Sequence, residues 1–162
     1  MNEFQAKRVK REFREKISAT PSEIFPLLCP VREYDWLDGW SCEMIYSDSG
    51  VVENNCIFTS SFPAGDKQTW ITTSHDAENY SKEFLVINPD SRVMRFGVSL
   101  RDCGNSTTEA HWTMLITALN EQGNTLVEGY TEEVHNNVMG MLAQSLKHYC
   151  ETGSKLKLHG HS

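Results

Sequence analysis

The stretch TPSEIFPLLCPVREYDWLDGW, residues 20–40, contains a helix start, two helix-breaking prolines and two of the four tryptophans of the chain. Thr20 can cap a helix, and Glu23 completes a T-x-x-E capping box with it. Pro26 and Pro30 interrupt that helix because proline has no N–H to donate to the preceding turn. The pattern therefore predicts a short helix and then a second short helical turn, before the chain continues into strands.

Strand-like patterns lie on both sides of this stretch. Residues 8–17 alternate apolar or mixed side chains with charged ones, which is typical of a strand with one solvated face. After the tryptophans, six further runs of strand residues recur with turn residues between them, which predicts an antiparallel meander. The six runs are residues 42–48, 55–62, 68–75, 82–87, 92–100 and 106–119.

The periodicity changes after the last strand-like run. The segment NEQGN, residues 120–124, reads as a turn, and residues 131–152 have the spacing of one long amphipathic helix. We expect residues 154–162 to form a frayed C-terminal tail whose two histidines bind metal only weakly. The sequence thus predicts a single α+β domain over residues 1–162. The expected apolar face of the long helix is Val134, Val138, Met141, Leu142, Leu146 and Tyr149.

Composition and charge exclude several classes of protein. A chain of 162 residues with 39% hydrophobic residues can bury a core without a metal or disulfide. The net charge of −7 argues against nucleic acid as a partner. The five cysteines show no CxxC spacing and no apolar leader precedes them, so we expect reduced thiols in the cytoplasm. No apolar run reaches the ~20 residues that cross a bilayer.

The order of one strand, two short helices, six strands and a long helix, together with the segments ISATPSEIFPLLCPVREYDWLDGW and HYCETGSKL, resembles the START-like superfamily. This superfamily is also called helix-grip, SRPBCC or birch-pollen-allergen-like. The resemblance implies a curved antiparallel sheet of about seven strands wrapped around the C-terminal helix, with two short helices sealing one end. The segment from Phe25 to Trp40 resembles an uncharacterised bacterial subgroup, which brings with it no activity.

The resemblance also implies an apolar cavity for a small hydrophobic or amphipathic molecule, lipid- or polyketide-like. Trp36 and Trp40 would cover its mouth as a lid or rim, because an indole offers a broad apolar surface and one N–H that can stay in contact with water. The same side chains could instead form a solid core. The residues expected to line the cavity are Phe58, Trp70, Met94, Phe96, Trp112, Met114, Tyr130, Val134, Val138 and Met141.

The sequence contains no catalytic motif that we recognise, so we assign no catalytic residue, no metal ligand and no cofactor. Three functions stay open: a binding protein, a cyclase or dehydratase acting on a polyketide-like substrate, and a module that binds a protein partner. A homodimer is possible. The polar residues that could orient a ligand are Glu43, Thr72, Arg95, Tyr130 and Asn137, and we expect Arg95 to lie on the solvated face.

Overall fold

The computed structural model describes residues 3–61 and 66–158 of the chain. Its elements follow the predicted order, with one additional helix near the C-terminus. They are β1 (Arg8–Ile17), α1 (Pro21–Ile24), the 3-10 helix η1 (Phe25–Leu27), α2 (Glu33–Trp36), β2 (Cys42–Tyr46), β3 (Ile57–Ser60), β4 (Gln68–Asp76), β5 (Ser81–Asn88), β6 (Arg92–Gly104), β7 (Thr107–Ala118), α3 (Glu121–Gly129) and α4 (Glu132–Thr152).

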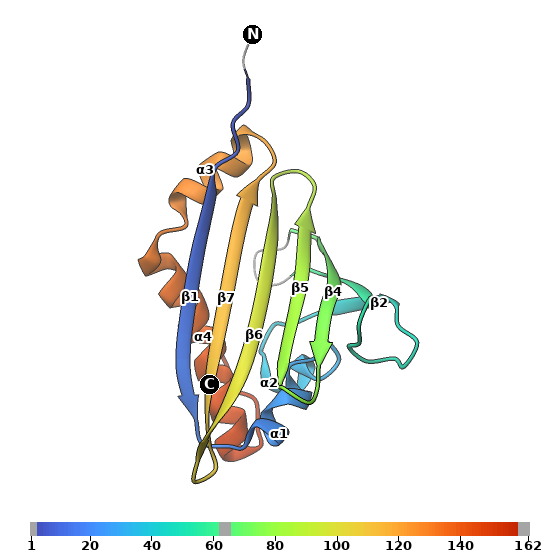
Figure 1. Cartoon of the computed structure of the whole chain (residues 1–162), viewed down its shortest axis with the longest axis vertical. Coiled ribbons are helices and arrows are strands. Elements are labelled where there is room, and N and C mark those ends of the chain that lie inside the picture. The colour runs from blue at the N-terminus through green and yellow to red at the C-terminus, as the bar shows by residue number, and fades with distance from the viewer. Residues whose placement is uncertain (1–2, 62–65, 159–162) are drawn as a thin grey trace.

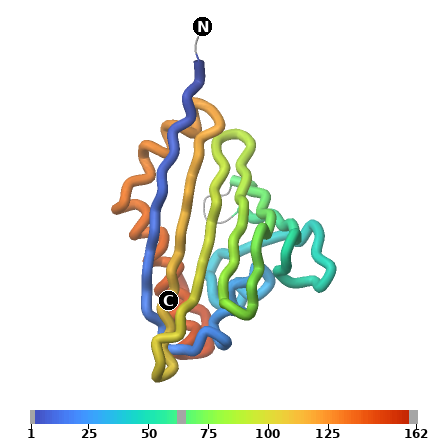
Figure 2. Tube along the Cα trace, viewed as in Figure 1, coloured from blue at the N-terminus to red at the C-terminus, as the bar shows by residue number. Residues whose placement is uncertain are grey.

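All seven strands form one antiparallel sheet in the order β1-β7-β6-β5-β4-β3-β2. The first strand thus pairs with the last, and Figure 2 shows the blue N-terminal strand beside β7. Helix α4 lies behind this curved sheet, with α3 near one end and the short helices α1 and α2 at the other (Figure 1). The predicted α+β class and sheet of about seven strands are confirmed.

The capping box predicted for the first short helix is present. The Thr20 hydroxyl accepts a hydrogen bond from the Glu23 backbone N–H at 3.3 Å, and the Glu23 carboxylate accepts one from the Thr20 N–H at 3.0 Å. Both bonds satisfy N–H groups that the first turn leaves without a helical partner. The chain therefore turns from β1 into α1 at a fixed angle.

Helix α3 was not predicted, and the interpretation of residues 120–124 as a turn is wrong. The Asn120 side chain accepts a hydrogen bond from the Gly123 N–H at 2.9 Å and caps this helix. Two glycines within nine residues weaken the helical signal in the sequence. Tertiary packing stabilises α3 despite its low helix propensity. Gly123 lies directly against the backbone of Ser91, and Val127 is buried.

Helix α4 has the predicted length but a different buried face. Thr131 caps its start, and Gly153 ends it in the left-handed conformation at φ 73°. Val134 is 40% exposed, so its placement on the apolar face was wrong. The error arises because the sequence pattern was read from apolar residues alone. The buried face of α4 also includes a histidine and a serine, which shifts it around the helix. The buried residues are His135, Met139, Ala143, Ser145 and Leu146.

The described part of the C-terminal tail is docked, contrary to the expectation of a frayed terminus. Leu156 forms an isolated parallel bridge with Leu37, and the Leu158 N–H donates to the Asp38 carboxylate at 3.1 Å. The tail therefore packs against the segment that follows α2. The two histidines of the tail lie outside the described residues.

We predict opposite effects for alanine at two helical glycines. A Cβ at Gly123 would lie 1.9 Å from the Ser91 carbonyl oxygen, whereas a Cβ at Gly140 in α4 meets nothing within 4 Å. Gly123→Ala should destabilise by about 2–3 kcal/mol because α3 must move off the sheet. Gly140→Ala should stabilise by about 0.5–1 kcal/mol by restricting the unfolded chain. Chemical denaturation of both variants measures the difference, and equal stabilities would show that α3 is docked differently.

Candidate functional site: an apolar cavity between sheet and helix

The sheet and α4 enclose a cavity of about 160 Å³, which we call the main chamber. Strands β3 to β7 provide one wall, α4 provides the facing wall, and the segment around α2 closes one end. The lining residues are Leu28, Pro30, Glu33, Trp36, Leu37, Trp40, Phe58, Gln68, Trp70, Phe84, Met94, Phe96, Val98, Trp112, Met114, Val138, Met139, Met141 and Leu142.

Aromatic rings from neighbouring strands form the sheet wall of the chamber. Phe58 stacks on Trp70 with ring centroids 5.4 Å apart, and Phe96 stacks on Trp112 at 5.8 Å. Trp70 also meets Phe96 edge to face at 6.0 Å, so the rings form a chain across four strands. The period-2 alternation of strands places these side chains on one face. The rings thus pack against one another along the wall.

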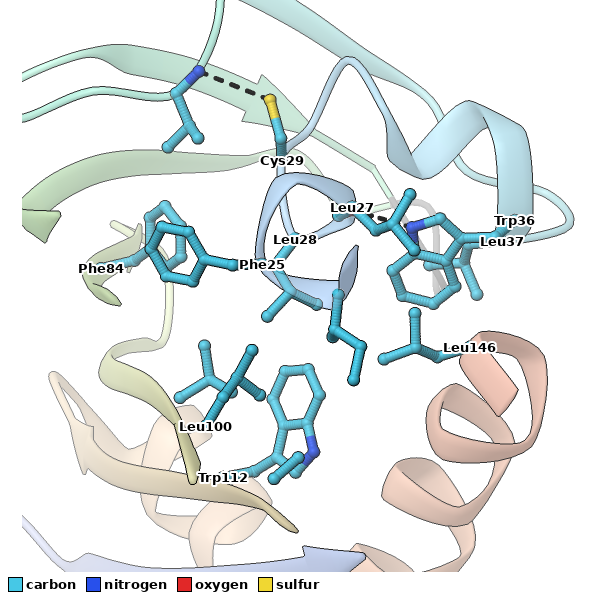
Figure 3. Packing of buried hydrophobic residues seen from close by; sticks show 14 of the residues in the cluster. Phe25, Leu27, Leu28, Cys29, Trp36, Leu37, Phe84, Leu100, Trp112 and Leu146 are labelled. Carbon is cyan, nitrogen blue, oxygen red and sulfur yellow. Dashed lines mark hydrogen bonds between the residues drawn. The ribbon is translucent and has the colours of Figure 1, made fainter. Parts of the chain in front are cut away.

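Both tryptophans of the sealing segment, residues 20–40, are buried at the closed end of the chamber. Trp36 is 1% exposed and Trp40 is 8% exposed. Their indole N–H groups donate to backbone carbonyls, Trp36 to Leu27 and Trp40 to Pro30, each at 2.8 Å. The expectation that these N–H groups face water is therefore wrong. Figure 3 shows Trp36 beside Leu27 of η1, Leu37, and Leu146 of α4.

A second chamber of about 270 Å³ adjoins the first. The two share Gln68, Met94, Met114 and Val138, so these four side chains stand at the junction between them. The second chamber extends toward α3 and is more polar than the main chamber. Its other lining residues are Val86, Asn88, Arg92, Ile116, Leu126 and Tyr130.

The structure brings together most of the side chains that the sequence assigned to a cavity. Phe58, Trp70, Met94, Phe96, Trp112, Met114, Val138 and Met141 line the main chamber together with Trp36 and Trp40. Tyr130 lines only the second chamber, and Val134 lines neither. Sequence reasoning missed Glu33 and Gln68, because a glutamate within a charged run and a glutamine at a strand start look like surface residues.

The polar residues considered from the sequence do not orient toward the main chamber. Glu43 and Asn137 are exposed, and Thr72 is buried against the Cys56 thiol at 3.2 Å. Arg95 pairs with Glu83 at 2.7 Å and is exposed, as predicted. Among the described residues, the ionisable side chain that lines the main chamber is Glu33.

Burial raises the pKa of the Glu33 carboxyl group to about 8, and the charge of Lys82 acts in the opposite direction. Lys82 itself is 3% exposed. Its ammonium donates a hydrogen bond to the Leu28 carbonyl and lies 4.3 Å from the centre of the Phe25 ring. Burial lowers the pKa of this ammonium to about 8. The half-buried Glu33 carboxyl group and the buried Lys82 ammonium thus both lie near the closed end of the chamber.

Glu15 is a buried acid on β1, the strand that pairs with β7 and its Trp112. Its carboxylate accepts a hydrogen bond from the Trp112 indole N–H at 3.2 Å, and its Oε1 has no hydrogen-bond partner among the described residues. Burial raises its pKa to about 7, opposed by the Trp112 hydrogen bond and by the charge of Lys147. The hydrogen bond to Glu15 therefore orients the Trp112 ring in the cavity wall, while burial of the Glu15 carboxyl group costs stability.

His135 is the buried histidine of α4, and its contacts are structural. Its Nε2 lies 3.2 Å from the Glu12 carbonyl oxygen, which can only accept, so Nε2 carries the proton. Its Nδ1 then accepts from the Tyr130 hydroxyl at 2.8 Å. Burial lowers the pKa of His135, which favours the neutral form of the ring. This pair joins α4 to β1 beside the second chamber.

No group of three or more His, Cys, Asp or Glu side chains within residues 3–61 and 66–158 could hold a metal ion. All five cysteines are free thiols. In the same part of the chain, no helix combines the length and the apolar character needed to cross a membrane.

Comparisons with known proteins identify the fold. Norcoclaurine synthase from Thalictrum flavum, in complex with dopamine and hydroxybenzaldehyde, matches with a TM-score of 0.67 and 14% identity over 90% of this chain and 87% of that one. A START superfamily protein from Mycobacterium smegmatis matches with a TM-score of 0.66 and 11% identity, over 90% and 99% of the two chains. The protein therefore has the START-like, birch-pollen-allergen-like fold that the sequence resemblance implied.

A further match extends the range of proteins that share this fold. The di-domain ARO/CYC protein BexL from the BE-7585A biosynthetic pathway aligns with a TM-score of 0.65 and 13% identity, over 88% of this chain and 46% of that one. No protein-family model and no curated protein matches the sequence. At these identities the likeness defines the architecture, and function has to be argued from the cavity.

We predict that Glu15 makes stability depend on pH. Between its ordinary pKa of 4.5 and its folded value near 7, the native state binds more protons than the unfolded state, so stability falls as pH rises. Glu15→Gln keeps an acceptor for Trp112 and removes this cost. It should stabilise by about 2–3 kcal/mol at pH 8 and by much less at pH 5.

Urea denaturation at both pH values measures this effect, with Glu78→Gln in an exposed turn as the control. A Glu15→Gln gain that is the same at pH 5 and pH 8 would contradict a buried, titrating carboxyl group.

Proposed function

We propose that the protein binds a small hydrophobic or amphipathic molecule, lipid- or polyketide-like, in the cavity between the sheet and α4. The observation that carries this proposal is the main chamber itself: α4 does not fill the concave side of the sheet, and an apolar space of about 160 Å³ stays open within the core. Protein interiors are normally packed without such voids, because each void forfeits van der Waals contacts. A bound apolar molecule would restore those contacts.

The lining supports a ligand with a flat or flexible apolar body. The aromatic chain of the sheet wall offers ring faces for stacking, while Met94, Met114, Met139 and Met141 can change rotamer to fit different shapes. The adjoining second chamber, with Arg92 and polar side chains, gives room for a more polar end of the molecule. Together the chambers favour an amphipathic ligand over a purely hydrocarbon one.

Catalysis of the cyclase or dehydratase type has weaker support. Moving protons between two positions of a substrate needs a pair of titratable groups that face it. Of the described residues that line the main chamber, Glu33 is the ionisable one, and Lys82 is engaged with Leu28 and Phe25. Binding is therefore the function that the geometry supports best.

We further propose a reducing, cytoplasmic compartment, in which five free thiols persist. The acidic net charge of −7 supports a role without nucleic acid. The homodimer stays a prediction that light scattering of the purified protein can check.

Two valines one turn apart on α4 give a matched test of the cavity. Val138 lines both chambers, whereas Val134 is exposed. The apolar fluorescent probe N-phenyl-1-naphthylamine should bind and quench tryptophan emission by energy transfer. Val138→Phe should fill the junction and exclude the probe from part of the cavity. We expect probe binding to weaken by about tenfold or more, which corresponds to a loss of about 1.4 kcal/mol of binding free energy.

The control Val134→Phe should leave the dissociation constant unchanged. Fluorescence titration of both variants measures the effect, and circular dichroism verifies that both stay folded. Probe binding that is weakened equally by the two substitutions, or by neither, would place the binding site outside the cavity.

A further inference from the structure

Glu33 is an ionisable residue in the lining of an otherwise mostly apolar chamber. Apart from Glu33 and Gln68, the described lining residues are aliphatic, aromatic, methionine or proline, with both indole N–H groups of the closed end already bonded to backbone. The backbone of Glu33 is held firmly, because its N–H donates to the Cys29 carbonyl at 2.9 Å and its own carbonyl accepts from Leu37 at 2.8 Å. The glutamate is thus fixed at the chamber wall.

The carboxyl group of Glu33 has no hydrogen-bond donor among the described residues. Lys82 influences it electrostatically, but the Lys82 ammonium is directed at the Leu28 carbonyl and the Phe25 ring. Glu33 is half-buried in apolar surroundings that raise its pKa, and an apolar residue at this position would avoid the cost of placing a carboxyl group there without a protein partner. A purely structural role therefore explains Glu33 poorly, whereas a missing partner inside the chamber explains it well.

The protonation state of Glu33 indicates the kind of partner. Because burial raises its pKa to about 8, the carboxyl group is mostly neutral at pH 7. A neutral carboxyl group both donates through its O–H and accepts through its carbonyl oxygen. Such a group matches a neutral hydroxyl or carbonyl oxygen on a ligand and gains little from a second charge in an apolar surrounding.

We propose that Glu33 anchors the ligand by hydrogen bonding to a neutral hydroxyl or carbonyl oxygen, while the apolar body of the ligand packs against the aromatic wall of the main chamber. This assignment rests on the proposed binding function. It defines the part of the ligand in the main chamber as an uncharged system of one or two rings with one oxygen at the α2 end, while the more polar end proposed above would extend into the second chamber. A cavity of about 150 Å³ is known to hold a benzene molecule, which sets the scale.

The test uses four probes that share one ring system: naphthalene, 2-naphthol, 2-naphthoate and 2-naphthylmethylammonium. Fluorescence titrations at pH 7 give their dissociation constants for the native protein, for Glu33→Leu and Glu33→Gln, and for the control Glu43→Leu on the exposed side of β2. The native protein should bind 2-naphthol about five- to tenfold more tightly than naphthalene, which is the effect of one buried hydrogen bond. Both charged probes should bind more weakly than 2-naphthol.

The variants separate the hydrogen bond from general packing. Glu33→Leu should bring the two dissociation constants together, Glu33→Gln should keep most of the preference because an amide also donates and accepts, and Glu43→Leu should change nothing. The four probe affinities of the native protein need no variant and decide the head-group class even if Glu33→Leu is poorly folded.

Several results would overturn this assignment. Equal binding of naphthalene and 2-naphthol to the native protein, a preference that survives Glu33→Leu, or tightest binding of either charged probe would each refute Glu33 as an anchor for a neutral oxygen, while leaving the cavity as a binding site. Failure of all four probes, naphthalene included, would refute the proposed binding function and the anchor together.

Discussion

The missing N–H of Pro30 is the constraint on which the closed end of the cavity depends. Pro30 cannot donate to the Leu27 carbonyl, so the 3-10 helix η1, which ends at Leu27, is not continued. Side chains donate hydrogen bonds to the backbone carbonyls that have no helical partner. The Trp36 indole donates to Leu27, the buried Lys82 ammonium to Leu28 and the Trp40 indole to Pro30. These three bonds hold η1, α2 and β5 together. The two tryptophans are thus explained by hydrogen bonding as much as by their apolar surface.

With that end closed, the sheet and α4 need only stay apart to leave a chamber. The rings of Trp70, Phe96 and Trp112 pack against one another on the sheet side of this chamber. The arrangement has a cost in stability, because Glu15 and Glu33 lie in surroundings that disfavour their charged forms. An unfilled cavity and acids in apolar surroundings both lower stability. Such unfavourable features are typically found where a protein's function requires them.

The sequence predicted the architecture well and the polar chemistry poorly. Strand alternation and the proline-broken segment gave the element order, the sheet wall and both tryptophans, since these depend on local pattern. Helix α3 escaped prediction because Gly123 is chosen for its close approach to Ser91 rather than for helix propensity. Glu33 and Lys82 were missed because charged residues in a sequence are normally taken as solvated. The tertiary structure buries Lys82 and places the half-buried Glu33 at the wall of the main chamber.

The pairing of the first strand with the last determines how this chain can be made. Glu15 on β1 and Trp112 on β7 touch although 97 positions separate them, and among the strands of the described residues β7 is the one that pairs with β1. During synthesis the inner face of β1 therefore has no partner strand until β7 has been made, and contacts between residues so far apart in the sequence form slowly. The charged side chains that alternate along the outer face of β1 are of the kind that disfavours pairing of an edge strand with another chain. The same pattern that makes β1 readable as a strand thus also suits it to the edge of the sheet.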